Sequence, residues 1–208
     1  MQNHTQKWLV IGLLGLCGLG GVVAVQAQTT TQPAQNAASD TQRDANQQQR
    51  IDQGLKSGQL STRQASNLEQ REANLDRTER RDMRNGPMTK AENAQIRRMQ
   101  NRDSAAIYKD KHDAIKGNPN SASSRRLQAD VQRNAYQEQR LANGVKSGQL
   151  TNREDARMQG RQAHVDHMEH GADANNGRVG PREQKRIQRT DNRDSKRIYR
   201  TKHNRAKR

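Results

Sequence analysis

The chain is poor in the residues from which globular cores are usually built. Its 208 residues include no phenylalanine, one tryptophan and three tyrosines, and only 29% of them are hydrophobic. This composition lies close to that of disordered proteins, because little apolar surface is available to offset the entropy lost on folding. We therefore expect a thin core. An active site that must desolvate a small substrate is not expected.

Cysteine is also nearly absent. The single one, Cys17, follows Leu16, whereas a lipoprotein signal would have a small residue there. It lies within an uncharged apolar run over residues 8–25, which follows a positive charge and precedes small residues around Ala27. This is the layout of a secretory signal peptide, and an uncleaved membrane anchor is the alternative. Cleavage near Ala27 would leave residues 28–208, in the periplasm or secreted, without disulfides or thiolate metal sites.

Negative charge is scarce relative to positive charge, and the formal net charge is +16. Residues 178–208 hold 13 Lys or Arg against 3 Asp or Glu, whereas the stretch 87–113 holds 6 against 4. Surfaces that carry phosphate or carboxylate groups suit such a charge, although a solvated tail that aids solubility is the simpler interpretation. With three tyrosines for stacking, no specific nucleic-acid recognition is expected. The candidate anion-binding residues are Arg182, Lys185, Arg186, Arg189, Arg193, Lys196, Arg197, Arg200 and Lys202.

The chain does contain an internal repeat. Asp40–Leu60 aligns without a gap with Asp130–Leu150, and Asn101–Asp113 aligns with Asn192–Asn204. We interpret the two halves as copies of one unit. The predicted organisation is a signal peptide (1–27), a flexible lead (28–39), a first repeat (40–113), a linker (114–129) and a second repeat with a basic tail (130–208).

Apolar residues fall at the same places in both copies and recur at spacings of 4, 7 and 11 residues. Ile51 and Leu55 correspond to Leu141 and Val145, for example. Such spacings place residues on one face of a helix and do not alternate as in a strand. We predict an all-α fold with a thin core and three helices per copy: 40–56, 61–84 and 89–115, then 128–146, 151–170 and 181–205.

Short turns with a built-in helix start separate these helices. Gly58 and Gly148 suit the left-handed conformation that ends a helix. A Ser or Thr follows, with Gln or Glu three residues later, which is the pattern of a capping box. The predicted boxes are Ser61 with Gln64, Thr89 with Glu92, and Thr151 with Glu154, and the pattern recurs more loosely before Pro181, with Glu183.

These junctions resemble the Leu-Thr-x-x-Gln motif of the Spy/CpxP group of periplasmic proteins. Glu replaces Gln at two sites and Ser replaces Thr at one. Members of that group are exported, basic, all-helical proteins that act as ATP-independent chaperones or envelope-stress adaptors. The chain also resembles uncharacterised exported proteins of Gram-negative bacteria. The resemblance implies partner binding through Leu60, Ser61, Gln64, Met88, Thr89, Glu92, Leu150, Thr151 and Glu154.

Three histidines form a candidate metal site. His164, His167 and His170 follow one another at intervals of three residues, and two of them on one helix face suit zinc or copper. The first copy has asparagine and arginine at the matching positions, so the cluster does not belong to the repeat. Solvated histidines near a helix C-terminus are the alternative.

Calcium is not expected at the helix junctions. Gly86, Met88 and Glu92 echo the second half of an EF-hand loop, but Arg81 stands where the first carboxylate ligand would be. Half a loop cannot supply the oxygen ligands that calcium needs.

One carboxylate in each copy falls on the apolar stripe, one helical turn before Ile107 in the first copy and before Ile198 in the second. These are Asp103 and Asp194, and a carboxylate in such a place needs a partner. We predict that Arg50 and Arg140, near the ends of the first helices, pair with them.

No phosphate-binding glycine loop, nucleophile elbow or apolar carboxylate pair is recognisable, so we expect no enzyme. The leading hypothesis is an exported stress protein that binds acidic or unfolded partners, or envelope phosphate groups, through basic helix faces. The alternatives are a periplasmic zinc- or copper-binding protein and a structural anion-binding protein of the cell envelope.

Overall fold

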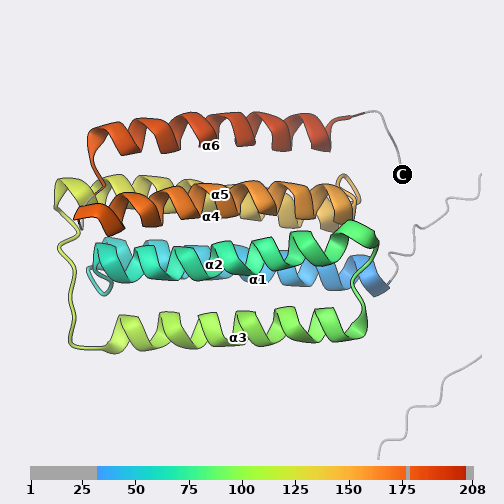
Figure 1. Cartoon of the computed structure of the whole chain (residues 1–208), viewed down its shortest axis with the longest axis horizontal. Helices are drawn as coiled ribbons and strands as arrows, with labels where there is room; N and C mark the ends of the chain where they lie inside the picture. Colours follow the sequence, from blue (N-terminus) through green and yellow to red (C-terminus); the bar gives the residue numbers. More distant parts are fainter. Residues whose placement is uncertain (1–31, 177–178, 205–208) are drawn as a thin grey trace, which may run out of the picture.

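The computed structural model describes residues 32–176 and 179–204, which fold into long helices with no strand among them (Figure 1). The all-α prediction is confirmed. The predicted signal peptide, residues 1–27, lies outside the described part of the chain, and no helix within that part is both long and apolar enough to span a membrane. The elements are α1 (Gln32–Ser57), α2 (Thr62–Asp82), the 3-10 turn η1 (Met83–Asn85), α3 (Lys90–His112), α4 (Ala122–Lys146), α5 (Asn152–Asn176) and α6 (Pro181–Lys202).

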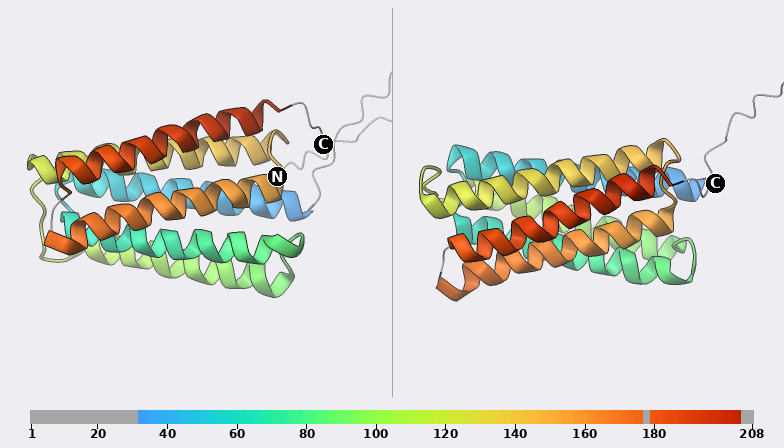
Figure 2. Two further views of the ribbon diagram at one scale, coloured as in Figure 1. Left: turned by 45° about the horizontal axis from the view of Figure 1, so that its top comes forward. Right: turned by 90° about the horizontal axis from the view of Figure 1, so that it is seen from above.

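Four helices form the centre of the bundle and two flank it. Helix α1 packs most extensively on α4, and α2 packs most extensively on α5. Helix α3 lies along α1 and α2, whereas α6 lies along α4 and α5 (Figures 1 and 2). The two predicted repeats therefore do not form separate bodies, because each inner helix packs against its counterpart from the other copy.

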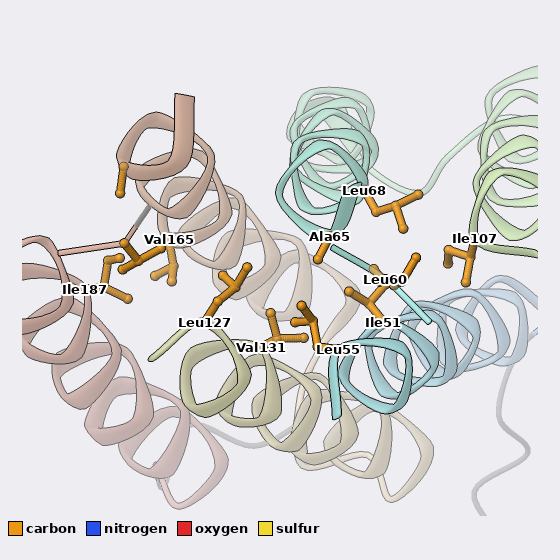
Figure 3. Packing of buried hydrophobic residues seen from close by; sticks show 12 residues of the cluster. Ile51, Leu55, Leu60, Ala65, Leu68, Ile107, Leu127, Val131, Val165 and Ile187 are labelled. Atoms are coloured by element: carbon orange, nitrogen blue, oxygen red, sulfur yellow. The ribbon is translucent and has the colours of Figure 1, made fainter. Parts of the chain in front are cut away.

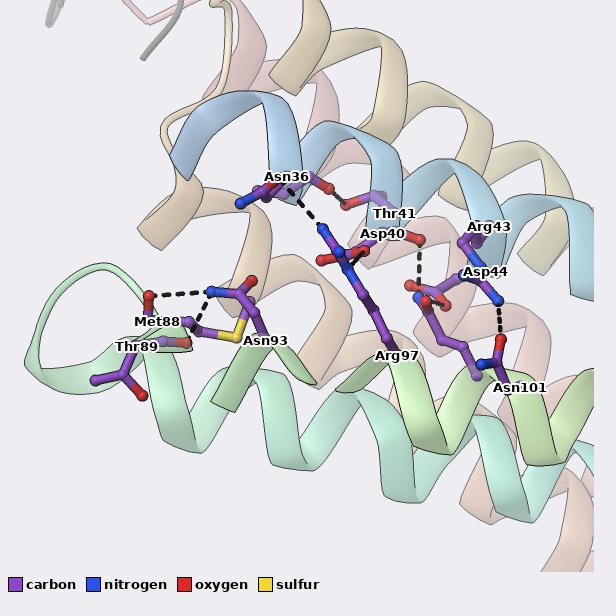
Figure 4. Close-up of polar contacts among 12 residues, drawn as sticks. Asn36, Asp40, Thr41, Arg43, Asp44, Met88, Thr89, Asn93, Arg97 and Asn101 are labelled. Atoms are coloured by element: carbon purple, nitrogen blue, oxygen red, sulfur yellow. Dashed lines mark hydrogen bonds and ion pairs between the residues drawn. The ribbon is translucent and has the colours of Figure 1, made fainter. Parts of the chain in front are cut away.

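The lead predicted to be flexible, residues 28–39, is helical from Gln32 onward. Tertiary contacts explain the difference. Ala37 is buried against α4 and α5, and the Thr41 hydroxyl donates to Asp155 Oδ2 at 2.8 Å. Arg97 of α3 also donates to Asn36 Oδ1 at 3.3 Å and lies 3.9 Å from Asp40 (Figure 4). Contacts with three other helices thus stabilise as a helix a polar segment whose sequence alone does not predict one.

The predicted linker, residues 114–129, is also shorter than expected. Helix α4 begins at Ala122, because Ser121 caps it by accepting from the Ser124 backbone N–H at 3.1 Å. Leu127, inside the predicted linker, is fully buried. Helix α5 continues to Asn176 rather than ending at 170, while α3 and α6 end at His112 and Lys202, three residues earlier than predicted.

The predicted capping boxes are present at the first three junctions, whereas Gly180, the N-cap of α6, makes no side-chain capping hydrogen bond. The Ser61, Thr89 and Thr151 hydroxyls each accept a hydrogen bond of 3.2 Å from the backbone N–H three residues later. The side chains of Gln64, Glu92 and Glu154 accept in return from the capping residue's N–H at 2.7–2.9 Å. Gly58 and Gly148 have φ values of +72° and +69°, as their predicted role requires.

The apolar core is divided between the two ends of the bundle. One cluster gathers residues from the end of α1, the start of α2 and the start of α4 (Figure 3), among them Ile51, Leu55 and Val131. The other gathers Leu141, Val145, Met158 and their neighbours at the opposite end. Outside the clusters the interior holds many buried carboxylate and amide side chains, together with apolar residues such as Ala73 and Leu75.

Candidate functional site

A groove of about 810 Å³ opens between the end of α2, the first half of α5 and the second half of α6. Its walls are strongly basic, since seven arginines line it against a single acidic residue, Asp194. The arginines are Arg80, Arg84, Arg153, Arg157, Arg161, Arg193 and Arg197.

Helical spacing brings these arginines together. Three of them follow one another at intervals of four residues on α5, and Arg193 and Arg197 do the same on α6, so each set projects from one face of its helix. Buried Met83, Ala156 and Met158 also line the groove and support these faces. The site is therefore carried by packed helices.

Gly160 lets an arginine from α2 cross over α5. A Cβ at this position would lie 2.2 Å from the Arg80 side-chain Cδ, so any larger residue would displace that side chain. The absence of a side chain at Gly160 thus places the Arg80 guanidinium among the arginines of α5.

Most of this positive charge is not neutralised within the groove. Arg161 Nη1 lies 3.6 Å from Asp194 Oδ1, whereas in the described part of the chain Arg157 forms no hydrogen bond or ion pair and Arg197 acts on Asp194 only through its charge. Burial raises the pKa of Asp194, although Arg161, Arg197 and Arg193 each act to lower it. Clustered, unpaired guanidinium groups create a positive potential that attracts anions.

Part of the groove's positive charge has no counterpart in the first half of the chain. In the first half, Asn67 and Ala106 take the positions that correspond to Arg157 and Arg197, and Asn74 takes the position of His164. The extra basic charge noted in the second copy is therefore gathered partly on one surface.

Only some of the predicted anion-binding residues lie in the groove. Arg193 and Arg197 line the groove, but the other predicted basic residues of α6 do not. Lys202 instead donates to the backbone oxygen of Arg140 at 3.2 Å. The arginines of α2 and α5 were missed by sequence reasoning, although their four-residue spacing on α5 was a signal of a shared face.

The three histidines do not converge on one point. His164 lines the groove, whereas His167 Nδ1 lies 3.0 Å from Gln70 Oε1 and His170 Nδ1 lies 3.2 Å from Ser66 Oγ. Both of the latter partners belong to α2. Among the described residues, three ligand-bearing side chains meet at Glu69, Asp166 and Glu169 and not at these histidines.

The residues that carry the Leu-Thr-x-x-Gln resemblance make contacts within the fold. Leu60 and Leu150 are buried in the two apolar clusters. Met88 and Thr89 each offer a backbone oxygen to Asn93 Nδ2, at 3.1 and 2.9 Å (Figure 4). These residues hold helix junctions, and their binding of a partner stays a prediction.

The predicted partners of the two stripe carboxylates were wrong. Asp103 Oδ1 lies 2.7 Å from Arg71 Nε on α2, and Asp194 pairs with the corresponding Arg161. Arg50 donates instead to Ser104 Oγ at 2.6 Å, and Arg140 makes the matching 2.7 Å bond to Ser195. Each carboxylate turns toward the second helix of its copy, and the neighbouring serine turns toward the first.

The largest feature missed by sequence reasoning is a row of buried carboxylates along the bundle centre. Burial raises the pKa of Glu69 to about 7 and the pKa of Asp155 to about 7. A signal was present, because the α2 members recur at spacings of three and four residues on the buried face. The row comprises Asp44, Glu69, Glu72, Asp76, Glu79, Glu138, Asp155, Asp166 and Glu169.

Comparison with protein-family models, with curated proteins and with solved structures finds no match to this chain. Its function must therefore be inferred from the groove, the buried carboxylates and the surfaces around them.

Proposed function

We propose that this protein is an exported, non-enzymatic anion-binding protein that holds phosphate groups of an envelope polyanion in the arginine-lined groove. The observation that carries the proposal is the convergence of seven arginines from α2, η1, α5 and α6 around one acidic side chain. A guanidinium group presents a planar fork of N–H donors that matches two phosphate oxygens, which favours phosphate as the bound group.

An unfolded-protein client is supported less well by the described surface. The large hydrophobic side chains exposed there are Tyr108, Ile115, Tyr136 and Tyr199, and none of them lines the groove. Capture of unfolded chains usually depends on contiguous exposed apolar surface. The basic groove therefore favours a ligand with clustered negative charge over a nonpolar one.

Binding to tripolyphosphate and to lipopolysaccharide, measured by calorimetry over a series of salt concentrations, tests the proposal. Affinity should fall as salt rises, because bound counterions are released when phosphates are neutralised. The double variant R157Q/R197Q should bind at least about tenfold more weakly, since each charged hydrogen bond contributes about 1.5–3 kcal/mol.

The matched control is R189Q/R200Q, which removes the same charge from α6 outside the groove. It should retain most of the affinity. Equal losses in the two double variants would show that overall charge, and not the groove, determines binding. Equal affinity for poly-glutamate would point to an acidic protein in place of a phosphate-bearing partner.

A further inference from the structure

The innermost carboxylates of the bundle lack cationic partners. In the described chain, every ion pair joins a carboxylate to an Arg or Lys side chain that is at least 36% exposed, and none reaches Glu69, Asp166 or Glu169. All three are at most 1% exposed. Isolated buried carboxylates are costly unless a proton or a metal ion neutralises them.

Three of these carboxyl groups converge at one place. One carboxylate oxygen from each of Glu69, Asp166 and Glu169 lies within 4.8 Å of the others. Glu69 comes from α2, and the other two come from α5, one turn apart. This separation suits ligands that share one metal ion, because oxygen ligands of Mg²⁺ or Ca²⁺ lie about 2.0–2.6 Å from the ion.

Amide groups from the other two central helices orient the carboxylates. Gln48 Nε2 of α1 donates to Glu69 Oε2 at 2.9 Å. Asn134 Nδ2 of α4 donates to Asp166 Oδ1 at 2.9 Å and to Glu169 Oε1 at 3.2 Å. The second oxygen of each carboxylate is buried without a hydrogen-bond partner. Ligands fixed by outer hydrogen bonds, each with one oxygen left free, are typical of metal sites.

A fourth carboxylate on the same face of α2 is also buried without a partner. Glu72 follows Glu69 by one turn of α2, is 2% exposed, and has no hydrogen-bond partner at either oxygen. Burial raises the pKa of Glu72, and the charges of Asp44, Asp103, Glu69 and Asp166 raise it further, so Glu72 lies among the buried carboxylates of the bundle. A protein interior seldom leaves a whole carboxyl group without a partner.

We propose that Glu69, Asp166 and Glu169 bind one divalent cation that prefers oxygen ligands, namely Mg²⁺, Mn²⁺ or Ca²⁺. Carboxylate and carbonyl oxygens suit these ions, whereas zinc and copper favour nitrogen and sulfur ligands. The site lies inside the bundle, away from the helix junctions that echo half an EF-hand loop, and does not depend on the anion-binding groove.

The other half of the chain offers an incomplete counterpart. Asp76 and Glu79 take the positions that correspond to Asp166 and Glu169, but Gln159 takes the position of Glu69. An amide at that position cannot supply a negative charge to a cation. We therefore expect one bound ion per chain.

Refolding the full chain with and without metal tests the proposal, because a buried site loads most readily while the chain folds. The protein is unfolded with EDTA, refolded with Mn²⁺ and desalted, and bound Mn²⁺ is measured by electron paramagnetic resonance. We expect about one Mn²⁺ per chain and a higher melting temperature. Competition by Mg²⁺ or Ca²⁺ identifies which ion of the class is preferred.

The variant D166N/E169Q should lose the bound Mn²⁺, while D155N, which changes another buried carboxylate to its amide, should keep it. If the double variant does not fold, the variant E69Q tests the same prediction. It introduces the glutamine that stands at the corresponding position, Gln159, and should also lose the ion. Failure of the wild-type chain to retain Mn²⁺, Mg²⁺ or Ca²⁺ would overturn the proposal and leave protons to neutralise the cluster. Equal retention by wild type, D166N/E169Q and E69Q would overturn it as well.

Discussion

Single glycines decide where helices end and how closely segments approach in this protein. Gly58 has a φ of +72°, and a Cβ there would lie 3.1 Å from the backbone oxygen of Gly117 in the segment between α3 and α4. Gly171 lies in a helix, and a Cβ there would meet no atom within 4 Å. The same substitution should therefore have opposite effects at the two positions.

Replacement of Gly58 by alanine should lower the free energy of unfolding by about 1–2 kcal/mol, the cost of a left-handed conformation for a residue with a Cβ. Gly171→Ala should raise it by about 0.5–1 kcal/mol, because alanine loses less backbone entropy in a helix. Urea unfolding monitored by circular dichroism gives both values. Similar changes in the two variants would contradict the assigned backbone roles.

At the scale of helices, features determined by neighbouring residues were predicted correctly, whereas the packing of distant helices was not. The three full capping boxes are present, because the residues of each lie within four positions of one another. The pairing of α1 with α4 depends on surfaces that lie far apart in the sequence, and both copies have the same apolar stripe. Arg71 was not predicted as the partner of Asp103. Which arginine faces α3 depends on the rotation of α2 about its axis, and no local sequence pattern determines that rotation.

The groove and the buried carboxylates were hard to predict for a related reason. A helix face with Glu69, Glu72 and Asp76 looks solvated when it is read alone, and only its packing on α5 buries it. The basic excess of α6 was visible, but its combination with arginines of α2 and α5 required the arrangement of three helices.

One capping residue also joins two helices. Gln64 Nε2 donates to Asp113 Oδ2 at 2.8 Å, which ties the start of α2 to the end of α3. Gln64→Glu, the residue found in the other two boxes, would keep the cap but lose this donor and place two carboxylates together. We expect a loss of about 1–3 kcal/mol in the free energy of unfolding at pH 7.

This loss should shrink as the pH falls toward about 4 and the new glutamate is protonated. Glu92→Gln at the exposed junction is the control and should change the stability less. Urea titrations at pH 7 and pH 4.5 distinguish the two cases. A Gln64→Glu protein as stable as wild type at pH 7 would mean that the link to Asp113 contributes little.

Across the whole molecule, basic side chains dominate the surface and carboxyl groups fill the middle of the interior. Burial raises the pKa of Glu69 to about 7 and that of Asp155 to about 7, so the folded chain binds protons more tightly than the unfolded chain does. Their contribution to stability is fully present below the unfolded-state pKa of about 4, and is lost as the pH rises through about 7. The chain should therefore be stabilised by mild acid.

In EDTA-containing buffer, the melting temperature should rise as the pH is lowered from 8 to 5. Each of these two carboxyl groups contributes on the order of 3–4 kcal/mol at full protonation, from about 1.4 kcal/mol per unit of pKa shift. Thermal melts at one-unit intervals measure the trend, and D155N should reduce its slope. A melting temperature that falls steadily between pH 8 and pH 5 would show that these groups are already charged in the folded state.

The pairing of α1 with α4 and of α2 with α5 has a consequence for any half-length chain. A fragment that ended after α3 would leave uncovered the sides of α1 and α2 on which α4 and α5 now lie. Because the second half repeats the first in sequence, another copy of the fragment carries nearly matching surfaces. We therefore expect such a fragment to form a homodimer. The intact protein would then correspond to that dimer with its two subunits joined in one chain.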